Sequence, residues 1–368
     1  MTVTAPVSLG FTIVDAAPDP KSLRLGNHIM ADGSPNSAGV EDGIALTLRR
    51  DHAGDDSVIR VALILVPRFS MLSLSSLLEA AEKANQLSGK RLFEYSFFAC
   101  SGPVIPSQCG LSVEVRPIEE LVSTPPDLVL VIGDSVGTRF KSRRTEATLR
   151  QLKRQGVRIG GVGSACFILA RAGVLQDRPC AVPWYLREAY VENFSPHHAA
   201  ENLYLIDRDL VTCAGGVAML DLALALISRS FGNELAASIA DELMYGAIRS
   251  PGDTQSHGLV RRVKNPLVVQ LARLMEESVE PLVSPRDLAR RVCVSQRQME
   301  RLFSHHLGTT PSRYQKRVRL NRAQRMLRHT TLTVSEIAIA CGFQSLSHFS
   351  KVYRQTFGLS PRRDRILA

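Results

Sequence analysis

The sequence predicts an α/β domain followed by an all-helical domain, and three observations support this prediction. Apolar runs typical of buried strands alternate with amphipathic helices between about residues 58 and 247. The chain has 368 residues, which is too long for one ordinary hydrophobic core. Everything after residue 263 has helical patterns alone. We therefore expect a parallel sheet with helices on both faces, followed by a bundle of short helices.

The first predicted strand is VIRVALILV, at 58–66, and its unbroken apolar character is typical of a strand buried on both faces. A helix is predicted over 70–89, where apolar residues recur at helical spacing and Gly89 ends the pattern. Further strands are predicted at 95–100, 111–115, 127–133, 157–163, 203–206 and 210–213. Further helices are predicted at 143–156, 164–172, 218–232 and 234–246.

Polar, Gly- and Pro-rich stretches divide the chain into regions. Residues 1–57 show no sustained period, and we expect them to form a disordered extension. Residues 58–247 are expected to form the α/β domain, and residues 248–263 have the composition of a linker. The second domain is expected over residues 264–365.

Charge and cysteine usage restrict the function classes. Residues 258–368 contain 21 Lys and Arg against 7 Asp and Glu, whereas the remainder contains 24 against 28. A basic C-terminal third on an acidic remainder favours a polyanionic partner for that third alone. The seven cysteines form no CxxC pair, so we expect neither a metal nor a cofactor. Their scattered positions favour a reducing compartment. Without an apolar run of about 18 residues or a basic N-terminus, we expect a cytoplasmic protein with no membrane partner.

The basic third contains an internal repeat. The first copy is SPRDLARRVCVSQRQMERLFSHHLGTTP (284–311), and the second is TVSEIAIACGFQSLSHFSKVYRQTFGLSP (333–361). Each copy begins with a hydroxyl residue suited to a helix N-cap, continues through a short helix, a turn and a second helix, and ends in Gly-x-x-Pro. This pattern predicts two helix-turn-helix units, at about 284–306 and 333–356.

In a helix-turn-helix the second helix enters the major groove of DNA. Its predicted outward side chains are Gln296, Arg297, Gln298, Glu300 and Arg301 in the first unit and Ser347, His348, Lys351 and Arg354 in the second. The helix between the units, at 313–329, is rich in Arg and Lys, which suits phosphate contact and the spacing of the two units. The alternative is a helical bundle whose basic residues are merely solvated. The presence of two matched units argues against this alternative.

Residues 264–365 resemble the AraC-type DNA-binding domain. IAIACGFQSLSHFSKVYRQTFGLSP is close to the signature of that family. The resemblance implies that two recognition helices read successive segments of the major groove. By position, it marks Arg297, Glu300, Arg301, Ser347, His348 and Lys351 as base or groove contacts.

Residues 58–247 resemble the PfpI-like, class I glutamine-amidotransferase-like domain, which precedes the DNA-binding domain in the GlxA-type subgroup of AraC regulators. The resemblance rests on four segments in order: FSMLSLSSLLEAAEKANQLSG, GGVGSACFILARAGVL, PWYLREAY and LVTCAGGVAMLDLALALI. It implies a flavodoxin-like parallel sheet. Enzymes of this fold hold a cysteine nucleophile on a strained strand-to-helix turn, called the elbow here.

The elbow requires small residues two positions before and two after the nucleophile. Cys166 has Ser164 and Ile168 there, and Ile is too large, whereas Gly163 has Gly161 and Ala165. The elbow position therefore falls on Gly163, which has no side chain to react. Cys166 is then expected to be a small buried residue.

The resemblance also locates the catalytic base in a His-Trp pair, but here that pair is Pro183–Trp184. Proline cannot transfer the proton. His197 and His198 lie farther on and are expected at the surface. We therefore expect no catalysis, with a hydrolase or amidase using Cys166 as the alternative.

The elbow is instead expected to bind a small-molecule effector. The predicted ligand pocket consists of Phe69, Glu79, Gly163, Ser164, Cys166 and Trp184. A carboxylate and an aromatic ring suit an amine or amino acid. The resemblance implies a homodimeric transcriptional regulator, an activator that contacts RNA polymerase. A ligand-free architectural DNA binder is a further alternative.

Overall fold

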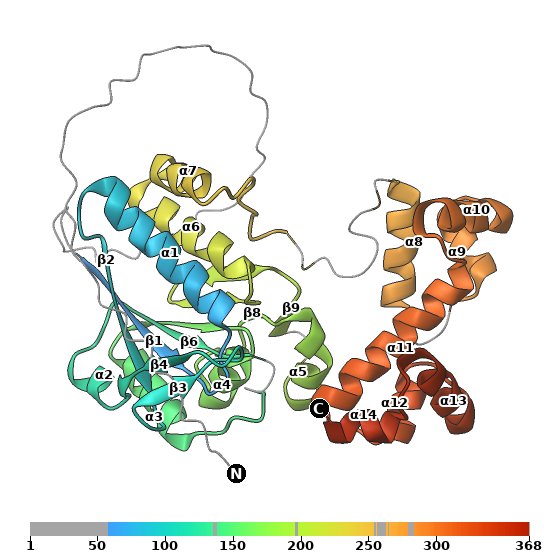
Figure 1. Cartoon of the computed structure of the whole chain (residues 1–368), viewed down its shortest axis with the longest axis horizontal. Helices are drawn as coiled ribbons and strands as arrows, with labels where there is room; N and C mark the ends of the chain where they lie inside the picture. The colour runs from blue at the N-terminus through green and yellow to red at the C-terminus, as the bar shows by residue number, and fades with distance from the viewer. Residues whose placement is uncertain are drawn as a thin grey trace, which may run out of the picture. The chain divides into compact units, whose positions relative to one another are not determined.

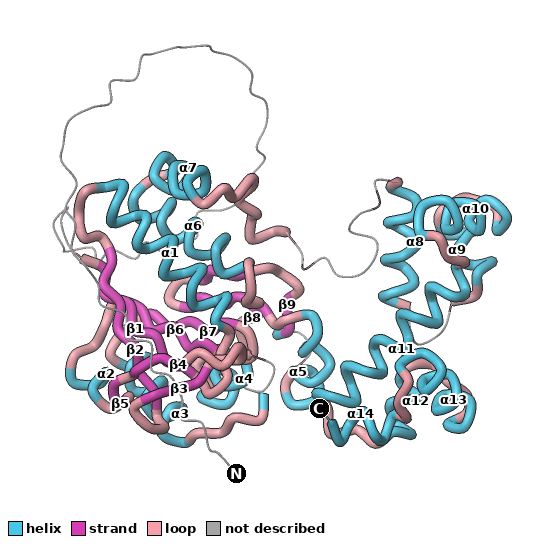
Figure 2. The backbone as a smooth tube through the Cα atoms, viewed as in Figure 1, coloured by secondary structure: helices cyan, strands magenta, loops and turns pink. Residues whose placement is uncertain are grey.

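The computed structural model describes residues 58–134, 138–195, 198–253, 255, 263, 265–278 and 283–367. The predicted extension at 1–57, half of the predicted linker (254 and 256–262), and His197 lie outside the described residues. Within the described chain, an α/β part precedes a part that contains only helices and loops (Figures 1 and 2).

A seven-stranded sheet forms the centre of the α/β part, in the order β10-β11-β7-β6-β1-β2-β5. Adjacent strands are parallel except β10 and β11, which form an antiparallel pair. The strands are β1 (Ile59–Leu65), β2 (Phe93–Ala99), β5 (Arg116–Pro117), β6 (Leu128–Ile132), β7 (Arg158–Val162), β10 (Tyr204–Asp207) and β11 (Leu210–Cys213). This sheet confirms the predicted fold class.

β1 is buried on both faces, as its unbroken apolar sequence predicts. Val61, Leu63 and Leu65 belong to one hydrophobic core, while Ala62 and Ile64 belong to the core on the opposite face. Alternate side chains of a strand point to opposite faces, so a central strand of such a sheet must be apolar at every position.

Helices cover both faces of the sheet (Figure 1). The first core contains side chains from α1 (Met71–Ser88), α6 (Ala218–Phe231) and α7 (Asn233–Glu242). The second contains side chains from α2 (Glu120–Ser123), α3 (Arg143–Arg154), α4 (Ala165–Ala172) and α5 (Arg187–Asn193). Local signals set the bounds of α1, because Ser70 caps its first turn and Gly89 ends it at φ 64°.

The short elements were not all predicted. The predicted strand at 111–115 lies outside the main sheet, in a hairpin of β3 (Val104–Pro106) and β4 (Ser112–Glu114). β8 (Cys180–Ala181) pairs with β9 (Ala199–Ala200), and the 3-10 helix η2 (Trp184–Leu186) leads into α5. Such elements are too short to produce a periodic pattern.

The described start of the predicted linker is anchored to the α/β part. The buried carboxylate of Asp221 on α6 accepts hydrogen bonds from the guanidinium and the backbone N–H of Arg249. Gln255 bonds the backbone of Val182, Trp184 and Asn202. The polar residues of this stretch therefore form specific hydrogen bonds with the α/β part.

The C-terminal part has two hydrophobic cores that share one long helix. Its helices are α8 (Pro266–Glu277), α9 (Pro285–Arg291), α10 (Gln296–Leu307), α11 (Pro311–His329), α12 (Val334–Ala340), α13 (Leu346–Phe357) and α14 (Pro361–Leu367). Tyr314 of α11 packs in the core with Met299 and Phe303, while Leu320 and Leu327 pack in the core with Phe349 and Tyr353. The repeat therefore forms two helix-turn-helix units.

The turns of the two units have different residues at their left-handed position. Gly342 adopts φ 72° in the second unit, and Cys293 adopts φ 56° at the matching position of the first. In both turns the next N–H bonds back to the first helix, from Val294 to Ala289 and from Phe343 to Ala338. A left-handed residue with a β-carbon costs about 1–2 kcal/mol, so the first turn is the more strained.

We expect Cys293→Gly to raise the free energy of unfolding by roughly 0.5–1 kcal/mol, because relief of the strain exceeds the added chain entropy. Gly342→Ala should lower it by about 1 kcal/mol for the converse reason. Urea denaturation followed by circular dichroism measures both. Equal effects of the same sign would contradict this account of the turns.

Candidate nucleic-acid interface and elbow

The two recognition helices present the predicted DNA-contacting residues to solvent. α10 begins after Ser295, whose hydroxyl accepts from the N–H of Gln298, and α13 begins after Ser345, which accepts from His348. All nine predicted residues are exposed: Gln296, Arg297, Gln298, Glu300, Arg301, Ser347, His348, Lys351 and Arg354. On each helix the opposite side is buried in the core of its own unit.

The first recognition helix carries an internal polar contact. The Gln296 amide donates to the Glu300 carboxylate at 3.2 Å, across one helical turn. Arg297 and Arg301 are exposed on the same helix. Guanidinium groups with amide and carboxylate groups are the side chains that bond base edges in the major groove.

The basic helix α11 divides its charged residues between two roles. Arg313, Lys316 and Arg317 are exposed, as phosphate contact requires. Arg319 instead donates to the carbonyl of Cys341, and Arg328 to the carboxylate of Asp364. Arg319 and Arg328 therefore bond within the protein, and the expectation of phosphate contact remains a prediction for the exposed residues of this helix.

The predicted elbow lies at the carboxyl ends of three parallel strands. β7 ends at Val162, Gly163 follows at φ 64°, and α4 begins at Ala165. The N–H of Gly163 donates to the carbonyl of Cys213, and the N–H of Gly133 donates to Val162. In open α/β sheets this edge is where ligands bind.

Backbones approach closely at this point. A β-carbon on Gly163 would stand 2.9 Å from the carbonyl oxygen of Gly133, and one on Gly133 would stand 2.5 Å from Oγ of Ser164. A β-carbon on Gly215 would lie 3.4 Å from Cα of Gly163 and from Oγ of Ser73. We call Ser73, Gly133, Gly163, Ser164 and Gly215 the elbow cluster.

The polar groups in and beside the elbow cluster differ in their hydrogen bonding. The hydroxyl of Ser73 accepts from the N–H of Gly216 at 2.8 Å. The hydroxyl of Ser164 is fully buried, and the described residues offer it no hydrogen-bond partner. Asp134 follows Gly133 directly and accepts from the hydroxyl of Tyr185, whose pKa is raised by burial and by this carboxylate.

The remaining predicted pocket residues are placed differently. Phe69 is fully buried just before α1. Glu79 is exposed on α1, near Lys83 and Tyr95, so the structure does not bring it to the elbow. It lies six residues beyond Ser73, which is about 9 Å along a helix. Ser73 is the α1 residue that reaches the elbow, and the sequence analysis missed it.

Trp184 is the first residue of η2. The backbone N–H of Trp184 donates to Gln255, and its ring packs edge-on against Tyr185 at 5.8 Å. Pro183 precedes it and has no proton-transferring group. His198 is partly buried, with Nε2 3.9 Å from the carboxylate of Asp177. The contacts of Trp184 hold η2 in place.

Cys166 is enclosed in the core on the α4 face of the sheet. Its side chain is fully buried, and burial, together with the neighbouring thiol of Cys180, raises its pKa well above the usual value. A thiol held protonated is a poor nucleophile. Among the described residues, no three His, Cys, Asp or Glu side chains come together as a metal site.

Comparisons with known proteins agree with both parts of the chain. A helix-turn-helix domain model matches residues 288–365. The transcriptional regulator GbdR of Pseudomonas aeruginosa is 37% identical over 83% of each chain, and ArgR of the same species is 35% identical over 83% of this chain and 92% of its own. GlxA of Rhizobium meliloti is 32% identical over 84% of this chain and 97% of its own.

A solved AraC-family regulator from Pseudomonas putida is 28% identical over 50% of this chain and 99% of its own, with a TM-score of 0.45. On the identity and coverage of the three relatives, the chain belongs to the AraC family of DNA-binding transcriptional regulators, with the GlxA-like architecture. In the part of the chain that the structure describes, no helix has the length and apolar character needed to cross a membrane.

The free thiols should differ in reactivity. Cys109 is exposed, and its hydrogen bond with Ser107 lowers its pKa, so its thiolate forms at lower pH than that of an ordinary cysteine. We expect iodoacetamide near neutral pH to label Cys109 in the folded protein, and to leave Cys166 and Cys213 unlabelled, because burial raises their pKa values.

Peptide mass spectrometry over a pH series measures the labelling at each site. Cys109→Ser is the control that should abolish the early signal, and denaturant should expose the buried thiols. Fast labelling of Cys166 in the folded protein would restore it as a nucleophile candidate.

Proposed function

We propose that a small-molecule effector binds at the elbow of a non-catalytic α/β domain and thereby controls DNA binding by the helix-turn-helix domain. The domains are residues 58–247 and 264–365, joined through 248–263, whose first residues are anchored. The observation that carries the proposal is Gly163, which stands at the strand-to-helix turn without a side chain. A turn without a nucleophilic side chain at this position can bind a ligand without reacting with it.

The groups available to an effector are polar and compact. Ser164 provides a buried hydroxyl, and Asp134 a carboxylate at the same sheet edge. Asp134 replaces Glu79 as the acidic group suited to an amine or amino acid. The cavity between α1, α6 and the sheet offers only apolar walls and Tyr95, so it suits such a ligand poorly.

The regulator acts by a difference in affinity. An effector that binds one arrangement of the protein more tightly shifts the population toward it by that difference. The proposal includes a homodimer in the cytoplasm, activation rather than repression, and contact with RNA polymerase. These features rest on membership of the AraC family.

A thermal-shift screen of amines and amino acids tests the effector site. A ligand at 100 times its dissociation constant should add about 2.7 kcal/mol to the free energy of unfolding, and so raise the melting temperature by several degrees. Asp134→Asn should reduce the shift, whereas the matched control Glu79→Gln should leave it unchanged. A shift lost in Glu79→Gln alone would place the site elsewhere, and hydrolysis of a ligand by the protein would favour the enzyme alternative.

A second experiment tests the DNA-contacting residues. Arg301→Ala should weaken binding to selected DNA sites by about 1–3 kcal/mol if the guanidinium makes a bidentate base contact. Arg150→Ala, which removes the same charge from the exposed side of α3, is the control and should bind as the wild type does. Fluorescence anisotropy with sites enriched from random DNA measures both. Equal weakening by the two variants would show a general charge effect.

A further inference from the structure

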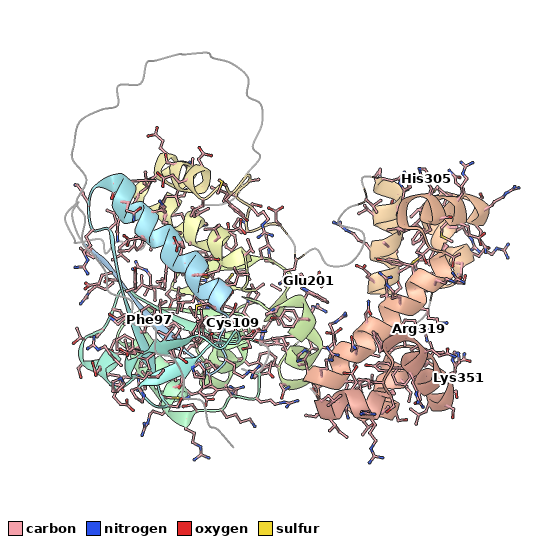
Figure 3. All side chains as sticks on the ribbon, in the orientation of Figure 1. Phe97, Cys109, Glu201, His305, Arg319 and Lys351 are labelled. Atoms are coloured by element: carbon pink, nitrogen blue, oxygen red, sulfur yellow. The ribbon has the colours of Figure 1, made fainter. Side chains whose placement is uncertain are left out.

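Arg319 lies on α11 and bonds the turn of the second helix-turn-helix unit. Its Nε donates to the carbonyl of Cys341 at 2.6 Å, and a terminal nitrogen donates to the carbonyl of Gly342. Its guanidinium carbon stands 4.0 Å from the centre of the Phe343 ring. Figure 3 shows Arg319 on α11 and Lys351 on the recognition helix α13. One side chain therefore holds three successive residues of the turn.

These contacts suit arginine specifically. The carbonyls at the end of α12 have no partner within the helix, and a cation there is favoured by the helix dipole. A planar guanidinium can bond two carbonyls through separate nitrogens while stacking on a ring, whereas a lysine ammonium cannot. The Arg319 side chain is partly buried, unlike the neighbouring Arg317, which is exposed.

The turn leads directly to the recognition surface. The Phe343 ring packs on Phe349 of α13 at 5.0 Å and on His348 at 6.1 Å. Phe349 is fully buried, whereas His348 is exposed among the predicted DNA contacts. Fixing Phe343 therefore fixes the start of α13, where base contacts are concentrated in helix-turn-helix proteins.

The same helix also belongs to the first unit. Tyr314, five residues before Arg319, packs on Phe303 at 5.6 Å, and its hydroxyl donates to Glu276 of α8. The first unit has no arginine at the matching position. Leu271 occupies the place in the first core that Leu320 occupies in the second. The residue before Leu320 is Arg319, whereas the residue before Leu271 is the exposed Gln270. The arginine contact is thus asymmetric between the units.

We propose that Arg319 is a positioning residue that holds the second recognition helix in register with the first, and makes no phosphate contact. Its loss leaves α11 and the first unit intact but lets α13 rotate relative to them. DNA reading should then fail in the part of the site that the second unit contacts. A phosphate contact would behave differently, because its loss weakens binding to all sequences and lowers the salt slope by about 0.9.

The test uses the full chain and DNA sites enriched from random sequence by the wild-type protein. Affinities are measured for every single-base variant of a site, for unrelated DNA, and across salt concentrations. Arg319→Met and Arg319→Lys are compared with the matched pair Arg317→Met and Arg317→Lys on the exposed side of α11.

We expect both Arg319 variants to lose discrimination by about tenfold or more in one segment of the site. The other segment, the affinity for unrelated DNA and the salt slope should remain as in the wild type. Arg317→Met should instead weaken all DNA, and Arg317→Lys should restore binding. Wild-type behaviour of Arg319→Lys, or a lowered salt slope in Arg319→Met, would overturn the proposal.

If the Arg319 variants lose helical structure, the Phe343→Leu variant tests the proposal instead. This variant removes the stacked ring and keeps the guanidinium. Discrimination lost in the same single segment would support the proposal. An unchanged base profile in Phe343→Leu would overturn it.

Discussion

Close contact between backbones at the ends of β6, β7 and β11 governs what the α/β domain can do. The carbonyl of Gly133 occupies the space that a side chain on Gly163 would need, and Gly215 closes the turn from the third strand. Gly163 therefore brings no side chain to this strand-to-helix turn. Cys166, which follows within one turn of helix, is directed into the core instead.

The DNA-binding part depends on a comparable constraint, the single helix α11 shared by two cores. Tyr314 and Val318 of its N-terminal half pack in the first core, and Leu320 and Leu327 of its C-terminal half pack in the second, so one rigid helix links the two units. Its basic side chains divide in the same way. Arg313 and Arg317 face solvent, whereas Arg319 and Arg328 complete the second unit. A high basic charge on a helix therefore overstates how much of it is available to DNA.

Most of the fold could be predicted because its signals are local. The apolar run of β1, the capped ends of α1 and the repeated Gly-x-x-Pro of the two units each depend on residues near one another in the chain. Strands β3, β5, β8 and β9 escaped prediction, since two or three residues carry no period, whereas β4 falls within the strand predicted at 111–115. At the elbow, Ser73 was missed and Glu79 was misplaced, because only the packed orientation of α1 shows which residue faces Gly163.

The sequence alone determined that a parallel α/β domain precedes two helix-turn-helix units, that nine outward residues lie on their second helices, and that Gly163 stands where a strand turns into a helix. These follow from periodicity and from residue identity. Tertiary structure alone decided that Ser164 is buried with no hydrogen-bond partner among the described residues, that the start of the linker is anchored through Asp221 and Gln255, and that Arg319 holds the turn before α13. Each of these joins groups distant in sequence, and no local pattern can encode such a contact.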